Sequence, residues 1–319
     1  MTLVGQLKEI ADKIRNRTTI TTKMTIDQMA EAIDDISGPE VKILDGTITE
    51  YKNDSITRLP RYYAFGSCLK LKTVELPNVT LITSYVFKGC TSLETALFPK
   101  LTNLTGFETF NGCSKLVNVD ISNVSSSIGG DMFKNCTSLK TISAPKVTSY
   151  IRENCFYGCS SLKTVDMPNL TQIYSSSFQN CTSLESLDFP NVKTLGARAF
   201  YGCTSLSSIN IPKVTLIENS TFYNCKLLAR LDLPAVTKIN GSSCFSNCSA
   251  LETLILRETS QLVTPSYGTF LSNTKIGKGT GYIYVPSSMY SNYVGSGVWK
   301  TYKDQFRTIE DYPEICNPT

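Results

Sequence analysis

The sequence predicts a solenoid of stacked repeats built around a parallel β-sheet. Three observations lead to this fold class: a Phe followed three residues later by Cys occurs nine times, successive Cys of this set are 22 or 23 residues apart, and apolar residues recur in a fixed order between them. A fixed period of this length is typical of repeat architectures. One copy has too few apolar side chains to close a core, so neighbouring copies must bury each other's open faces.

The Phe and Cys of each copy mark the repeats along the chain. The nine pairs are Phe65 and Cys68, Phe87 and Cys90, Phe110 and Cys113, Phe133 and Cys136, Phe156 and Cys159, Phe178 and Cys181, Phe200 and Cys203, Phe222 and Cys225, and Phe245 and Cys248. Between two pairs the sequence follows the frame LxxVxLPxVxxI.

The LxxVxL segment of each copy predicts a short β-strand. Pro77 follows this segment in the first copy, and Pro recurs there in most others. Because Pro has no N–H to give to a ladder, it is a suitable strand terminator. Strands of successive copies would lie about 4.8 Å apart in one parallel sheet. Ser122 and Arg257 replace the Pro, and Tyr150 replaces the aliphatic residue after a strand, so we expect local irregularities there.

The frame FxxCxxLxxVxLPxVxxI resembles that of the BspA-like leucine-rich-repeat family, from about Phe65 to Phe270. The resemblance implies an α/β leucine-rich-repeat solenoid of nine copies. It implies little about function, since the shared residues are the buried ones.

Both ends of the chain predict caps, so we expect four units. They are a helical hairpin over residues 1–37, a strand cap over 38–60, the repeats over 61–270 and a C-terminal cap over 271–319. In the first unit, apolar residues fall at helical spacing before the breaker Ser37-Gly38-Pro39. In the last, a strand ends at Pro286 and a helix follows around Trp299, Tyr302 and Phe306.

The segment LKEIADKIRNRTTITTKMTIDQMAEAIDDI resembles a short module of tail-associated and other virion proteins in phages and prophages of Gram-positive bacteria. This resemblance implies that residues 1–37 bind other virion proteins. The alternative is that the hairpin caps the solenoid, because an open terminal repeat exposes apolar surface.

Nine of the twelve cysteines recur at one repeat position, which predicts a buried ladder of free thiols. Repeat spacing alone leaves disulfides between neighbouring copies open. Cys155 and Cys244 precede a repeat Phe and are expected to pack beside it. Cys316, near the C-terminus, is predicted to be free and reactive.

Composition argues against several function classes. A net charge of +4 over 319 residues gives no basic footprint for nucleic acid, and no run of about 20 apolar residues predicts membrane insertion. The chain has no His, which removes His-based triads and most catalytic zinc sites, so we expect no enzyme and no cofactor. The segment MTLVGQLKEIADKIRNRT lacks the apolar core of a signal peptide. We therefore expect a virion-associated or extracellular protein if it is phage-derived, and a cytoplasmic one otherwise.

One position between the buried residues of each strand faces outward and is often acidic. Its acidic members are Glu75, Asp120, Asp166, Asp188 and Asp232. Like charges opposite each other on a sheet are unfavourable, so Asp166 beside Asp188 needs a local explanation. These acids either keep an exposed sheet solvated or form a strip that binds a cation or polar ligand.

A second outward position follows the repeat Phe and carries Tyr157, Tyr201 and Tyr223, with Tyr150 and Tyr174 on adjacent turns. Tyr combines apolar area with a polar tip, which suits glycan or protein recognition. Singly exposed aromatics also occur without any function.

These features together predict a non-catalytic binding or adhesion protein that displays its repeat surface to a host-cell surface protein or glycan, as a tail-associated phage or prophage component. The alternatives are a bacterial BspA-like surface adhesin and a structural spacer without a ligand.

Overall fold

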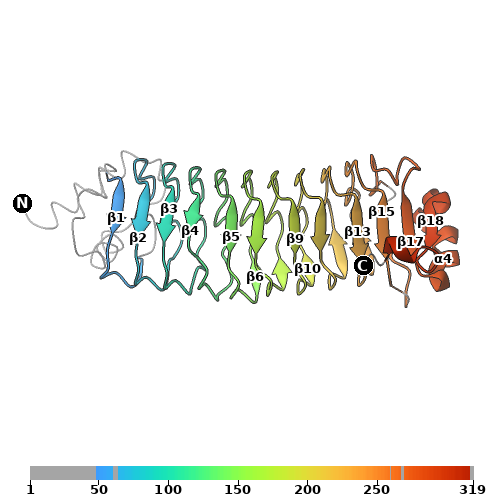
Figure 1. Cartoon of the computed structure of the whole chain (residues 1–319), viewed down its shortest axis with the longest axis horizontal. Coiled ribbons are helices and arrows are strands. Elements are labelled where there is room, and N and C mark those ends of the chain that lie inside the picture. Colours follow the sequence, from blue (N-terminus) through green and yellow to red (C-terminus); the bar gives the residue numbers. More distant parts are fainter. Residues whose placement is uncertain (1–47, 60–63, 259, 267–268, 317–319) are drawn as a thin grey trace, which may run out of the picture.

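The computed structural model describes residues 48–59, 64–258, 260–266 and 269–316. Successive copies stack along one axis into an elongated solenoid, and short helices lie at its C-terminal end (Figure 1). The predicted leucine-rich-repeat solenoid is confirmed. The expected hairpin of residues 1–37 falls outside the described residues, as does much of the 38–60 cap.

The LxxVxL segments, with one strand before them and two after them, form one side of the solenoid, which we call the main sheet. In the described residues it consists of four ladders of hydrogen-bonded strands, and every pair is parallel. Its strands are β1 (Glu50–Lys52), β2 (Thr73–Glu75), β3 (Thr95–Leu97), β4 (Asn118–Val119), β5 (Thr141–Ser143), β7 (Thr164–Asp166), β9 (Ser186–Asp188), β11 (Ser208–Asn210), β13 (Arg230–Leu233), β15 (Thr253–Leu256), β17 (Tyr282–Val285) and β18 (Phe306–Thr308). Equivalent positions of neighbouring copies face each other, as Val74 faces Tyr51 and Ala96. This register places each apolar position on the same side of the sheet.

A second set of parallel strands, which was not predicted from the sequence, lies on the opposite side of the core (Figure 1). Its strands are β6 (Tyr150–Ile151), β8 (Gln172–Ile173), β10 (Thr194–Leu195), β12 (Leu216–Glu218), β14 (Lys238–Asn240) and β16 (Thr264–Pro265). The buried aliphatic side chains of this segment stay in register, with Ile173 opposite both Ile151 and Leu195. The repeats thus close with a narrow second sheet, and no residue between 64 and 258 is helical.

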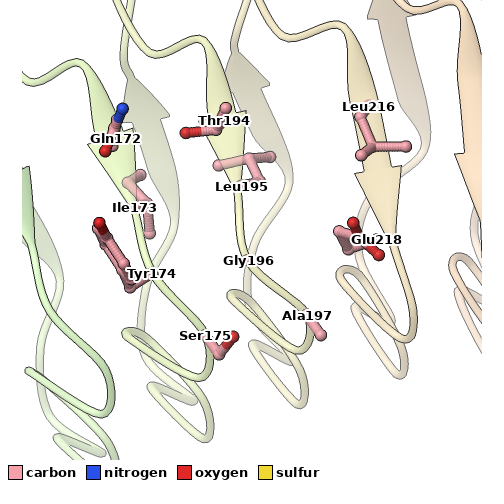
Figure 2. A pocket seen from close by; sticks show the side chains of 10 residues that line it. All are labelled: Gln172, Ile173, Tyr174, Ser175, Thr194, Leu195, Gly196, Ala197, Leu216 and Glu218. Atoms are coloured by element: carbon pink, nitrogen blue, oxygen red, sulfur yellow. The ribbon is translucent and has the colours of Figure 1, made fainter.

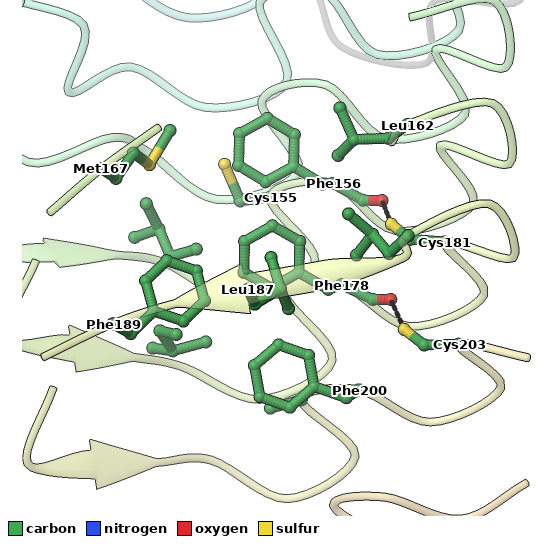
Figure 3. Close-up of a cluster of buried hydrophobic side chains, with 14 of the residues drawn as sticks. Cys155, Phe156, Leu162, Met167, Phe178, Cys181, Leu187, Phe189, Phe200 and Cys203 are labelled. Carbon is green, nitrogen blue, oxygen red and sulfur yellow. Dashed lines mark hydrogen bonds between the residues drawn. The ribbon is translucent and has the colours of Figure 1, made fainter. Parts of the chain in front are cut away.

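Stacked phenylalanines form the centre of the core. The rings of Phe110 and Phe133 have centroids 5.2 Å apart and planes 1° apart, and Phe133 stacks on Phe156 at 5.4 Å. Figure 3 shows the column continuing through Phe178 and Phe200. Equivalent rings of neighbouring copies therefore pack face to face along the solenoid.

The recurrent cysteine joins each copy to the one before it. Cys181 Sγ donates a hydrogen bond to the backbone oxygen of Phe156 over 3.0 Å, and Cys203 Sγ donates to that of Phe178 over 3.1 Å (Figure 3). The Phe156 oxygen also accepts the backbone N–H of Cys159 over 3.1 Å. The thiol thus supplies a second donor to a buried carbonyl, in a residue small enough for the core.

All twelve cysteines are free and buried, which confirms the predicted thiol ladder. Burial raises the pKa of the Cys113 thiol from 9.0 to about 12. Cys155 and Cys244 are buried beside the repeat phenylalanines, as expected. Cys316 is free, as predicted, but the expectation that it is reactive was wrong. Its thiol is buried in a small cluster with Ile255 and Tyr284 and is not accessible to solvent.

The C-terminal cap adds the final strands and covers the end of the core. After β17 and Pro286 come η1 (Ser287–Met289), α4 (Tyr290–Gly295) and η2 (Gly297–Gln305), which contains Trp299 and Tyr302. The Trp299 ring meets Phe270 edge to face at 5.3 Å, and its indole N–H donates to the Val263 oxygen over 2.6 Å. Phe306 was expected in this helix but begins β18, because pairing with Ile283 of β17 adds a last strand to the sheet.

Candidate recognition surfaces

The predicted acidic strip lies on the outer face of the main sheet, where alternate strand residues point away from the core. Asp166 and Asp188 occupy this position on neighbouring strands β7 and β9 and are exposed. Asp120 lies just after β4 and is half-buried. The structure therefore places the acids in one row along the sheet.

Each acid of the row has a partner within the chain. The bonds join Lys52 Nζ to Glu75 at 3.2 Å, Ser122 Oγ to Asp120 at 2.7 Å, Ser143 Oγ to Asp166 at 2.7 Å, Asn210 Nδ2 to Asp188 at 2.7 Å and Arg257 Nη2 to Asp232 at 2.7 Å. The donor to Asp166 comes from the preceding copy, and the donor to Asp188 comes from the following copy, so neither lies between the two acids. Hydrogen bonding to neutral groups thus offsets the repulsion expected between these two carboxylates.

The C-terminal end of the row has a different environment. Arg257 binds Asp232 through both Nε, at 2.9 Å, and Nη2, and Arg230 lies 3.6 Å away. The same two arginines donate to backbone oxygens of α5 (Pro313–Cys316): Arg230 to Ile315 over 2.6 Å, and Arg257 to Cys316 over 2.5 Å. These bonds hold the C-terminal segment against the sheet.

The C-terminal segment covers the outward positions of the last strands. Ile255 and Tyr284 occupy those positions on β15 and β17, and both are buried with Cys316. Tyr312 packs edge to face on Tyr284, with ring centroids 5.7 Å apart. The outer face of the sheet is thus open over β7 and β9 and covered over β15 and β17.

The predicted tyrosines lie along one edge of the solenoid, at the turn after each repeat Phe. Tyr201 and Tyr223 stack with ring centroids 4.7 Å and planes 11° apart. Tyr157 does not join this stack, since the intervening copy carries Gln179 at the same position. The Lys134 ammonium group lies 5.6 Å from the Tyr157 ring centroid. We call this row, Lys134 to Tyr223, the tyrosine edge.

A second aromatic group, which the sequence did not indicate as a unit, lies beside the second sheet. Tyr150 meets Tyr174 edge to face at 5.4 Å, and the Arg152 guanidinium lies 5.4 Å from the Tyr150 ring and 5.7 Å from that of Phe107. A hydrogen bond with Ser127, then one with Arg152, lowers the pKa of the Tyr150 hydroxyl. The position of Phe107 outside the repeat frame was the signal that the sequence offered; in the structure its side chain is 44% exposed.

Next to Tyr174 the second sheet has a hollow of about 440 Å³. Ten residues of three successive copies line it, with Tyr174 on one side and Glu218 on the other (Figure 2). Over the residues described, no three His, Cys, Asp or Glu side chains converge as a metal site. Nor does that part of the chain contain a helix of the length and apolarity needed to cross a bilayer.

A model of the BspA type leucine-rich repeat region matches residues 60–185 and 171–291, which together make up most of the chain. The chain belongs to the BspA-type leucine-rich-repeat family. No curated protein matches its sequence.

Several solved structures are also similar, among them bacterial leucine-rich-repeat proteins. One from Bacteroides ovatus has 20% identity and a TM-score of 0.45, with 83% of this chain and 84% of that one covered. The T. pallidum leucine-rich-repeat protein has 24% identity and a TM-score of 0.34, with coverage of 64% and 78%. The pneumococcal vaccine antigen PcpA has 15% identity and a TM-score of 0.40, with coverage of 82% and 76%.

Proposed function

We propose that this BspA-type protein is a non-catalytic binding or adhesion protein, which displays the tyrosine edge to a protein or glycan of a host-cell surface. The observation that carries this proposal is the stacked pair Tyr201 and Tyr223, which lies outside the core on the turns of adjacent copies. Stacked rings offer contiguous apolar area at low conformational cost, with hydroxyl groups at the rim.

The acidic strip is the weaker candidate because its carboxylates already have partners. Ser143 and Asn210 hydrogen-bond Asp166 and Asp188, and Arg257 forms a bidentate pair with Asp232. A ligand that bound these acids would have to replace contacts that the fold already makes. A ligand on the tyrosine edge would instead bury ring surface that is now half-exposed.

The biological setting we propose is a tail-associated component of a phage or prophage virion, with residues 1–37 binding other virion proteins. Support for this setting is the resemblance of the N-terminal segment alone. Mass spectrometry of particles induced from the source strain is expected to detect the chain. Deletion of residues 1–37 is expected to abolish incorporation and leave the melting temperature within a few degrees, because solenoid stability is roughly a sum over repeats and their interfaces.

Two results would contradict the virion setting. Recovery of the chain in the cell envelope and not in particles would favour a BspA-like surface adhesin. Aggregation or a large fall in melting temperature on deletion of residues 1–37 would show that this segment caps the solenoid.

Binding through the tyrosine edge is tested with the double variant Tyr201→Ala, Tyr223→Ala against the matched control Tyr201→Phe, Tyr223→Phe. The alanine pair is expected to weaken adhesion to a panel of Gram-positive cells at least fivefold, and the phenylalanine pair, which keeps the stacked rings, by less. Equal adhesion by wild type and the alanine pair would contradict this use of the edge. No adhesion by any form would favour a structural spacer.

A further inference from the structure

The hollow on the second sheet is one copy wide and results from a local change in side-chain size. In the middle copy, Thr194 and Gly196 occupy the two positions where one neighbouring copy carries Gln172 and Tyr174. The neighbour on the other side carries Leu216 and Glu218 at these positions. Figure 2 shows Gly196 between Tyr174 and Glu218. Thr194 and Gly196 thus form the floor of the hollow, and Tyr174 and Glu218 form its two walls. These walls belong to copies two strand spacings apart, about 10 Å.

Backbone geometry keeps this floor low. A Cβ added at Gly196 would lie 2.3 Å from the backbone N of Ser175 and 2.8 Å from its Cα, so no side chain fits at this position without moving the chain. The hollow therefore cannot be filled from Gly196. Thr194, at its rim, is exposed and is the place where a larger residue can be introduced.

Other side chains of the fold hold both walls in place. Tyr174 is 36% exposed and packs edge to face against Tyr150, which itself lies under the Arg152 guanidinium. Opposite, the Glu218 carboxylate accepts a hydrogen bond from Asn240 Nδ2 over 3.1 Å. An aromatic ring and a carboxylate that are already positioned need little ordering when a ligand binds.

The chemistry of the hollow suits one class of ligand. A sugar ring has an apolar C–H face and a rim of hydroxyl groups, and it needs an aromatic surface together with hydrogen-bond acceptors and donors. Tyr174 supplies the first, while Glu218, Gln172 and Thr194 supply a carboxylate, an amide and a hydroxyl. Glu218 disfavours an acidic sugar, since like charges repel.

We propose that this hollow is a carbohydrate subsite, which binds an uncharged hexose or N-acetylhexosamine unit with its ring on Tyr174 and its hydroxyl groups on Glu218. The inference rests on the proposed binding function and narrows the class of ligand to a glycan. One sugar of that glycan binds in the hollow on the second sheet, which is separate from the tyrosine edge.

The test uses the full chain on an array of neutral di- to tetrasaccharides, followed by calorimetry with the strongest binder. Tyr174→Ala and Glu218→Gln are each expected to weaken that binding at least tenfold, and Tyr174→Phe, which keeps the ring, less than threefold. Leu227→Ala, which truncates an exposed side chain outside the hollow and the tyrosine edge, serves as the control and is expected to bind the sugar as wild type does.

A second variant tests the hollow without touching its walls. Thr194→Trp is expected to fill the space, abolish sugar binding and leave the melting temperature within a few degrees. Array binding that Tyr174→Ala, Glu218→Gln and Thr194→Trp leave unchanged would overturn the inference, as would the absence of array binding. If cell adhesion persists in either case, the proposed function stands and only the subsite is lost. Binding of a lysine-rich peptide but no sugar, sensitive to Glu218→Gln, would also overturn it.

Discussion

In the middle of the main sheet, Asp166 and Asp188 are exposed and accept hydrogen bonds from neutral side chains, whereas at the C-terminal end Asp232 pairs with Arg257 and α5 covers Ile255. The two regions share parallel strands with apolar residues at the same repeat positions. They differ at outward positions and at Arg257, where the copies of Asp166 and Asp188 have Pro168 and Pro190. One repeat position thus serves as solvated surface in one place and as the docking site of the chain's own tail in another.

Raising the pH is expected to have the largest effect, because it acts on the thiol core that both regions share. Burial raises the pKa of Cys113 from 9.0 to about 12, and burial likewise raises the pKa of Cys136 and Cys181. The unfolded chain therefore loses these protons at a lower pH than the folded chain. This contribution to stability is complete below pH 9 and is lost as the pH rises towards 12.

Thermal unfolding monitored between pH 8 and pH 11 is expected to show a fall in melting temperature on the order of 10 °C or more above pH 9, since each unit of pKa shift corresponds to about 1.4 kcal/mol. A melting temperature that stays constant across this interval would contradict the buried thiol ladder.

Exchanging the outward residues of the two regions is expected to have the next largest effect. Ile255→Asp places a carboxylate in the apolar cluster beneath α5. It is expected to lower the free energy of unfolding by about 2–4 kcal/mol or to detach the C-terminal segment from the sheet. Asp188→Ile, the reverse change in the open region, is expected to alter it by about 0.5 kcal/mol or less. Urea unfolding of both variants measures the difference. Equal effects would mean that the two regions do not differ in burial.

A smaller effect than that of Ile255→Asp is expected from Arg257→Ala, which removes the bidentate pair with Asp232 and the bond to the Cys316 oxygen. The expected loss is about 1–2 kcal/mol, confined to the tail. Titration with a thiol reagent is the decisive measurement: one thiol, Cys316, should react in the native variant, and the ladder thiols should react only after unfolding. Ser143→Ala, the matched change in the open region, should expose no thiol. Protection of Cys316 in Arg257→Ala would show that the arginine does not hold the tail.

The periodic part of the molecule followed from the sequence, because residues such as Phe110 and Cys113 have the same neighbours in every copy. The proximity of Tyr201 and Tyr223 could be inferred from the sequence for the same reason, since both follow the Phe of adjacent copies. The contact of Arg257 with the Cys316 oxygen could not be inferred, since no period relates residues 59 apart at a chain end. Arg257 was recognised only as a departure from the frame.

The second sheet and its hollow were missed for a different reason. Main-sheet strands of similar length were predicted from the LxxVxL frame, whereas β8 and β10 each contain a single buried aliphatic residue and therefore show no alternating pattern. The hollow also depends on Gly196 between two larger side chains of adjacent copies. Sequence alone does not give the direction of side chains at a turn, so these residues could not be brought together beforehand.

The bond from each ladder Cys to the Phe oxygen of the preceding copy has a consequence for how such a chain can vary in length. The bond involves only two adjacent copies, and it recurs from Cys90 to Cys248 with donor–acceptor distances of 2.8 to 3.2 Å. A whole copy can therefore be inserted or removed within the array without a new kind of contact, and each insertion lengthens the solenoid by about 4.8 Å. The copies that contain Arg230 and Arg257 cannot be inserted or removed in this way, because these two arginines bind the C-terminal segment. Related proteins with solenoids of different length are therefore expected to gain or lose copies on the N-terminal side of β13.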